Sequence, residues 1–137
     1  MATARVSRGR QTEQLVADYV RRIWPNAQRV AASLPGADIL NTPPFAFEVK
    51  ARRAFNPKEW LKQAKKNAKP GHAPVVIMRP DGMGEASIGE WPIFMAFEDY
   101  MMYVEYIVLM GEQRNEWMDR AIEAGWQPAE LSDRTDS

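Results

Sequence analysis

The first third of the chain shows one helical and three strand-like patterns of apolar residues. Over residues 11–24 apolar side chains recur with the 3.6-residue period of an amphipathic helix, which ends at Pro25. Residues 28–33 (QRVAAS) and 37–40 (ADIL) are short apolar runs separated by a Pro-Gly turn, so we expect them to pair as strands. Residues 45–51 (FAFEVKA) follow a second turn and give the clearest strand pattern in the sequence.

The next segment predicts a second helix and a buried strand. Asn56 and Pro57 open this helix, which runs to about residue 68 with apolar residues inward and lysines outward. Residues 73–78 (APVVIM) form a continuous apolar run, which is typical of a central strand buried on both faces. A leading helix, three strands, a helix and a further strand predict an α/β fold with a central mixed β-sheet flanked by helices.

The second half of the chain predicts a loop, an edge strand and extra C-terminal helices. Residues 79–92 are rich in glycine and are expected to form a hairpin or loop, and residues 93–97 an edge strand. Residues 98–110 predict a helix that is apolar nearly all round and therefore lies in the core. Its second apolar face would be covered by a final helix at 112–124 or by a second subunit. The tail, 130–137, is expected to be frayed.

Composition limits the class of protein. With 137 residues, of which 45% are hydrophobic, the chain suits one domain over its whole length, with a core at about 8–110. The absence of cysteine excludes disulfides, thiolate metal sites and a cysteine nucleophile, and a lone histidine, His72, argues against a zinc or histidine-based hydrolase. Acids interrupt the longest apolar run and no secretory signal is evident, so we expect a cytoplasmic, intracellular protein without membrane contact, one that a phage could encode in a bacterial host.

The neutral total charge conceals two oppositely charged halves. Residues 1–70 contain 14 Lys and Arg against 5 Asp and Glu, a net charge of +9, whereas residues 71–137 contain 4 against 13, a net charge of −9. A basic half is typical of a site for a polyanion, because each neutralised phosphate releases counterions. The two halves can equally pair with each other across the fold.

Three charged residues stand among the apolar residues of two predicted strands. Residues two apart on a strand share a face, so Glu48 and Lys50 project the same way while Phe47 and Val49 point into the core. If the strands are neighbours, Asp38 lies beside Glu48, and two carboxylates that close need a cation or a proton to offset their repulsion. A hard divalent ion such as Mg²⁺ suits these oxygen ligands, with the backbone carbonyl of Val49 completing the set.

This arrangement outlines a site for phosphodiester hydrolysis, in which Lys50 orients or helps to deprotonate an attacking water. Asp38 followed by the acid-x-lysine sequence at 48–50 resembles the signature of the PD-(D/E)xK nuclease superfamily. The resemblance includes Glu13 on the leading helix, at the place of an additional metal-site acid, and Gln63 on the helix after the lysine strand, at a position that contacts the site in many members.

Within that superfamily the order of these motifs looks most like the archaeal and phage type of Holliday junction resolvase, over about residues 5–80. The resemblance implies a restriction-endonuclease-like core and a homodimer. It also implies a Mg²⁺-dependent endonuclease, with Mn²⁺ able to substitute, that cuts four-way or other branched DNA. Ala37 stands where the signature has a proline, which weakens the motif without changing its chemistry.

Basic residues around the proposed site are expected to contact DNA phosphates, which position the protein without reading sequence. Guanidinium groups suit phosphate geometry particularly well. Together with Ser33 and Gln63 from the resemblance, the expected DNA contacts are Arg8, Arg10, Arg52, Arg53, Lys62, Lys65 and Lys66.

Simpler interpretations of the same residues remain open. Glu13 can be an acid in the first turn of a helix, where the macrodipole favours it. Asp38 can cap a turn, and Glu48 and Lys50 can form a solvated strand face. The fold can also serve an exonuclease or nicking nuclease that acts on linear DNA, or a catalytically silent DNA-binding module.

Overall fold

The computed structural model describes residues 2–31, 34–52 and 54–127, with side chains from Ser7 onward. The chain divides into two compact units, Met1–Asp99 and Tyr100–Ser137, which are described separately. The predicted frayed tail, 130–137, lies outside the described residues, as do Ser33 and Arg53.

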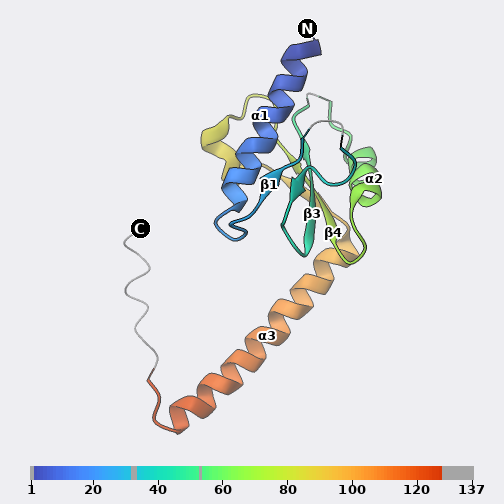
Figure 1. The fold of residues 1–137 in the computed structure, drawn as a ribbon. Coiled ribbons are helices and arrows are strands. Elements are labelled where there is room, and N and C mark those ends of the chain that lie inside the picture. The colour runs from blue at the N-terminus through green and yellow to red at the C-terminus, as the bar shows by residue number, and fades with distance from the viewer. Residues whose placement is uncertain (1, 32–33, 53, 128–137) are drawn as a thin grey trace. The chain divides into compact units, whose positions relative to one another are not determined.

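The first unit is an α/β structure with a mixed three-stranded sheet flanked by helices, which confirms the predicted α/β class and mixed sheet (Figure 1). In chain order the described elements are α1 (Ala2–Val20), β1 (Gln28–Arg29), β2 (Ile39–Leu40), β3 (Phe45–Lys50), α2 (Pro57–Asn67), β4 (Ala73–Met78), the 3₁₀ helix η1 (Glu85–Glu90), β5 (Ile93–Met95) and α3 (Phe97–Glu123), which continues into the second unit.

The three-stranded sheet has β4 at its centre, as the continuous apolar run predicts. β4 pairs in parallel with β3 and antiparallel with β5, and all six of its residues are buried. β1 and β2 form a separate two-stranded antiparallel ladder. Asp38, just before β2, joins this ladder to β3, because its backbone N–H donates a hydrogen bond to the Phe47 carbonyl at 3.0 Å.

The two faces of β3 and β4 pack against different helices. Phe47 and Val49 of β3 belong to a core cluster with α1 residues that include Val16. Val76 of β4 packs with Trp60 of α2 in a second cluster. Since side chains alternate along a strand, the odd-numbered positions of β3 face α1 and the even-numbered positions face α2.

Helix α1 begins earlier than the sequence pattern predicts. The prediction of residues 11–24 was wrong at both ends, because the helix runs from Ala2 to Val20 and the chain then turns before Pro25. Residues 2–10 show no apolar period, and the pattern therefore gave no sign of a helix there. Arg8 and Arg10 consequently lie on the helix and not before it.

The predicted loop at 79–92 contains η1, and the two predicted C-terminal helices are one. α3 continues through Gly111, where a single glycine within a helix costs about 1 kcal/mol relative to alanine. No residue of α3 is buried in the described part of the chain. In the described part of the chain, none of the helices combines the length and apolar character that crossing a membrane requires.

Candidate metal and nucleic-acid site

Asp38 is held firmly between β1 and β3. Its carbonyl accepts a hydrogen bond from Val30 N–H at 2.9 Å, and its own N–H bonds to β3. Its side-chain Oδ2 accepts a hydrogen bond from the Val49 backbone N–H at 2.7 Å. The carboxylate therefore points at β3, beside Glu48, and does not simply cap the turn that precedes it.

Glu48 and Lys50 form a buried ion pair on the α2 side of β3. Their residues are 3% and 9% exposed, so the interpretation as a solvated strand face is wrong. Lys50 Nζ lies 3.2 Å from Glu48 Oε1 and donates a hydrogen bond to Gln63 Oε1 of α2 at 2.7 Å. Asn67, one turn further along α2, donates to Glu48 Oε2 at 3.4 Å. Both carboxylate oxygens of Glu48 thus have a partner.

The two carboxylates lie close enough to influence each other. Burial raises the pKa of Asp38 to about 7, against the lowering effect of the hydrogen bond from Val49 N–H. The charges of Glu48 and Glu13 raise this pKa further, whereas the charge of Lys50 lowers it. Asp38, Glu48, Glu13 and Lys50 therefore share one electrostatic environment, which favours a proton or a cation at Asp38.

Glu13 lies in the middle of α1, so the alternative of an acid in a helix's first turn is wrong. Its Oε2 is 3.6 Å from the Arg29 guanidinium on β1. Burial raises the pKa of Glu13 and the charge and hydrogen bonding of Arg29 lower it, while Glu48 raises it and Arg10 lowers it. These interactions place Glu13 at the periphery of the same acidic group.

Arg29 and Asn67 are contacts that the sequence pattern did not reveal. Arg29 pairs across the β1–β2 ladder with Ile39, the neighbour of Asp38, and this register brings its guanidinium to the site. Asn67 lies four residues after Gln63 and thus on the same side of α2. In the sequence, the only sign of the Asn67 contact is its spacing of four residues from Gln63 on the helix that follows the strand of Lys50.

The donor set suits a hard cation with oxygen ligands. The Val49 carbonyl points to the same strand edge as its N–H and hence toward Asp38, because the Lys50 carbonyl at the opposite edge accepts from Arg79 N–H. Within the described residues no three or more Asp, Glu, His or Cys side chains form a group able to hold a metal ion. A site here would use two carboxylates, one carbonyl and water, as Mg²⁺ commonly does.

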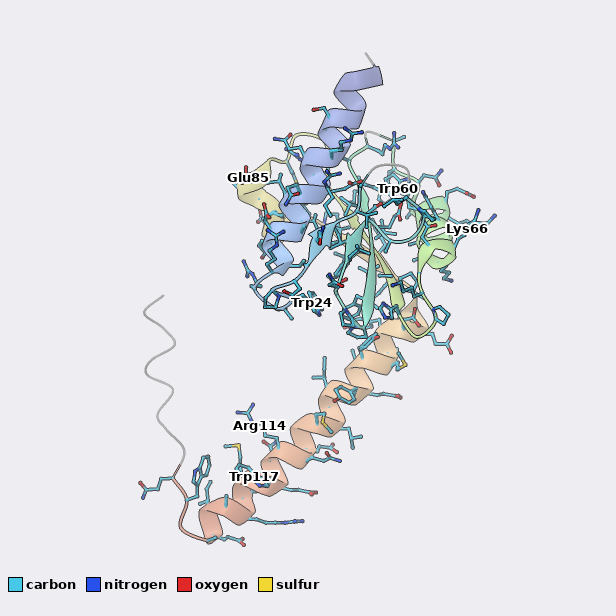
Figure 2. The ribbon with its side chains drawn as sticks, viewed as in Figure 1. Trp24, Trp60, Lys66, Glu85, Arg114 and Trp117 are labelled. Carbon is cyan, nitrogen blue, oxygen red and sulfur yellow. The ribbon has the colours of Figure 1, made fainter. Side chains whose placement is uncertain are left out.

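The described basic residues that are expected to contact DNA lie on α1, on α2 and after β3. Arg8 is 3.6 Å from Asp81, and this pair joins the basic and acidic halves of the sequence. Arg10 and Arg52 are exposed. The exposed side of α2 carries Lys62, Lys65 and Lys66, and Figure 2 shows Lys66 on the side of the helix away from the strands.

The chain was compared with models of protein families, with curated proteins and with solved structures, and none of them matched. The geometry of Asp38, Glu48 and Lys50 is therefore the main support for a functional interpretation. The resemblance of their spacing to the nuclease signature adds to it.

Proposed function

We propose that the protein is a Mg²⁺-dependent DNA endonuclease with a restriction-endonuclease-like core, acting on four-way or other branched DNA. The observation that carries the proposal is the hydrogen bond from Val49 N–H to Asp38 Oδ2, which fixes a perturbed carboxylate beside the buried Glu48–Lys50 pair. Carboxylates with a perturbed pKa beside a specific charged partner are typical of functional sites.

Asp38, Glu48 and the Val49 carbonyl are the groups that would hold the ion, with Glu13 as a supporting acid. A bound Mg²⁺ would supply charge stabilisation for the phosphodiester oxygens and lower the pKa of water. The preference for an oxygen-liganded ion follows from the carboxylate and carbonyl donors. Burial raises the pKa of Asp38, so a positive charge beside this carboxylate is favoured, and a cation could take the place of the proton.

Lys50 would orient the attacking water or carry positive charge against the scissile phosphate. In the protein alone it donates to Gln63 and is paired with Glu48, so its ammonium group is already directed at the acidic group. Gln63 acts on the site through Lys50 and is in this sense a positioning residue. An ammonium group held on a strand by an acceptor on the neighbouring helix needs less reorganisation when the reaction occurs.

The lysines of α2 together with Arg8, Arg10 and Arg52 would contact the DNA backbone. Lys62, Lys65 and Lys66 are exposed on the helix that also supplies Gln63 to the site. A basic helix that borders the reacting centre can track a phosphate backbone without reading bases. The preference for branched over linear DNA follows only from the family resemblance. The experiment must therefore test this preference separately from cleavage itself.

The deciding experiment compares a labelled four-way junction with a linear duplex of the same sequence, each incubated with Mg²⁺ and with chelator. We expect Mg²⁺-dependent cutting of the junction, abolished by Asp38→Asn. Asp18→Asn, at an exposed acid of α1, is the matched control and should cut like the parent.

Other outcomes point to the alternatives. Cutting of linear DNA alone would indicate an exonuclease or a nicking enzyme. DNA binding without cutting, together with no heat of Mg²⁺ binding in calorimetry, would indicate a silent DNA-binding module and overturn the proposal.

A further inference from the structure

Helix α3 has an acidic sector and, opposite it, an apolar face, although Met101 and Leu109 lie within or beside the acidic sector. With 3.6 residues per turn, six acids fall within one narrow sector of the helix. These are Glu98, Glu105, Glu112, Glu116, Asp119 and Glu123. On the opposite side lies what we call the apolar face of α3, formed by Tyr100, Tyr103, Val104, Ile107, Met110, Trp117, Met118, Ala121 and Ile122.

Two charged residues belong to this apolar face. Arg114 lies within it and Asp99 at its edge. Arg114 and Trp117 project from the same side of the helix, as Figure 2 shows. Trp117 packs on Trp126, with ring centroids 5.7 Å apart, as the chain turns back after the helix.

The apolar face of α3 is largely exposed. Tyr100, Ile107 and Trp117 are 52%, 67% and 60% exposed. An apolar stripe on a helix normally packs against another element, and a contiguous apolar patch of this length on a soluble domain marks an interaction surface. The face therefore requires a partner.

A second copy of this chain fits the face better than a lipid surface. Helices that lie on membranes carry Lys and Arg on their polar side, whereas the polar side of α3 carries six acids, which an anionic surface repels. Four large side chains of the face between residues 100 and 117 are on average about half exposed, which offers roughly 400 Å² at about 200 Å² per fully exposed side chain. With the half-buried Tyr103 and Val104 this approaches the roughly 600 Å² per partner at the lower end of stable interfaces.

We propose that α3 pairs with α3 of a second copy in an antiparallel arrangement centred at Ile107. Twofold symmetry then places Ile107 against the same residue of the other copy, and Arg114, two helical turns later, against Tyr100 and Asp99 of that copy. The arginine gains a ring face and a carboxylate, and the two helix dipoles oppose each other. The charge pattern therefore selects the antiparallel orientation. The pairing involves no residue of the metal site and does not depend on the proposed nuclease function.

The first test is the oligomeric state of the full chain by light scattering after size exclusion. We expect a mass twice the 15.6 kDa of one chain. Ile107→Glu should weaken the dimer at least about 100-fold in dissociation constant and leave a monomer. Ile23→Glu is the matched control, because Ile23 is also 67% exposed but lies after α1, and this variant should stay a dimer. Far-UV circular dichroism should show that both variants keep their helices.

The second test is the orientation of the pair. Since the chain has no cysteine, a single introduced cysteine reports one contact. Under mild oxidation Ile107→Cys should give a disulfide-linked dimer. Tyr100→Cys should not, because in the antiparallel pair the two copies of that residue are 14 positions apart, or roughly 21 Å along the axis.

Several results would overturn the proposal. A monomeric parent protein, or a dimer that Ile107→Glu leaves intact, would remove α3 from self-association. Efficient linking through Tyr100→Cys would show a parallel pair. Binding to neutral or anionic vesicles by a monomeric parent protein would make lipid the occupant of the face.

Discussion

The most direct consequence of the site geometry is an unusual dependence of stability on pH at Asp38. Its ordinary pKa of 3.8 is raised to about 7 in the folded protein, chiefly by burial. Because the folded-state pKa is the higher one, the protonated carboxyl contributes stability that is fully present below about pH 4 and is lost as the pH rises to about 7. Three pKa units correspond to about 4 kcal/mol in the free energy of unfolding. The metal-free protein should therefore become less stable over this range.

Asp38→Asn isolates this effect. An asparagine oxygen can still accept the hydrogen bond from Val49 N–H but carries no charge. In chelator, near pH 4, urea unfolding should give similar stabilities for the parent and the variant. Near pH 8 the variant should be more stable by about 4 kcal/mol. The shift at Glu13, which has the same sign, is present in both proteins and largely cancels in the difference.

Mg²⁺ supplies the control for this reasoning. At pH 8 the ion should raise the melting temperature of the parent protein by binding the folded state, and it should raise that of Asp38→Asn far less. A stability difference between parent and variant that is the same at pH 4 and pH 8 would refute the reasoning. It would mean that the carboxylate of Asp38 is ionised at no cost in the folded protein.

Two further predictions concern the buried ion pair and the basic helix. Lys50→Met should lower the free energy of unfolding by about 3–5 kcal/mol at pH 8, because it leaves Glu48 buried without a cation, and adding Glu48→Gln should restore much of that loss in urea unfolding. A double variant no more stable than Lys50→Met would contradict this. Replacing Lys62, Lys65 and Lys66 by alanine should reduce the slope of log binding constant against log salt by about 2–3 for duplex DNA, and an unchanged slope would exclude α2 from the interface.

The pattern of apolar residues predicted the elements that pack. Strand β4, predicted from its apolar run, and helix α2, predicted from its apolar and lysine-rich sides, were found where expected. In each element, the apolar residues that create the pattern are the ones that pack in the core. The N-terminal turns of α1 were missed because residues 2–10 show no apolar period in the sequence. The orientation of Glu48 and Lys50 followed from strand alternation, but their burial depends on the covering helix α2, which local sequence cannot specify.

Contacts that depend on the register of separate segments could not be predicted. The approach of Arg29 to Glu13 requires both the pairing of β1 with β2 and the packing of α1 on the sheet. The partner of α3 could not be predicted either, because an apolar helix indicates burial but does not say whether the partner belongs to the same chain.

The position of the Glu48–Lys50 pair is the strongest sign that this part of the sheet serves more than stability. A buried ion pair loses about as much in desolvation as it gains in attraction, so apolar residues of similar size would stabilise the fold at least as well. The neighbouring positions on β4, Val76 and Met78, are apolar, and packing against them would suit two more aliphatic side chains. Asp38 adds a buried carboxylate whose charged form is disfavoured by its surroundings. Burying these three groups beside one another costs stability, and the binding of a hydrated cation and a phosphate that we propose would account for that cost.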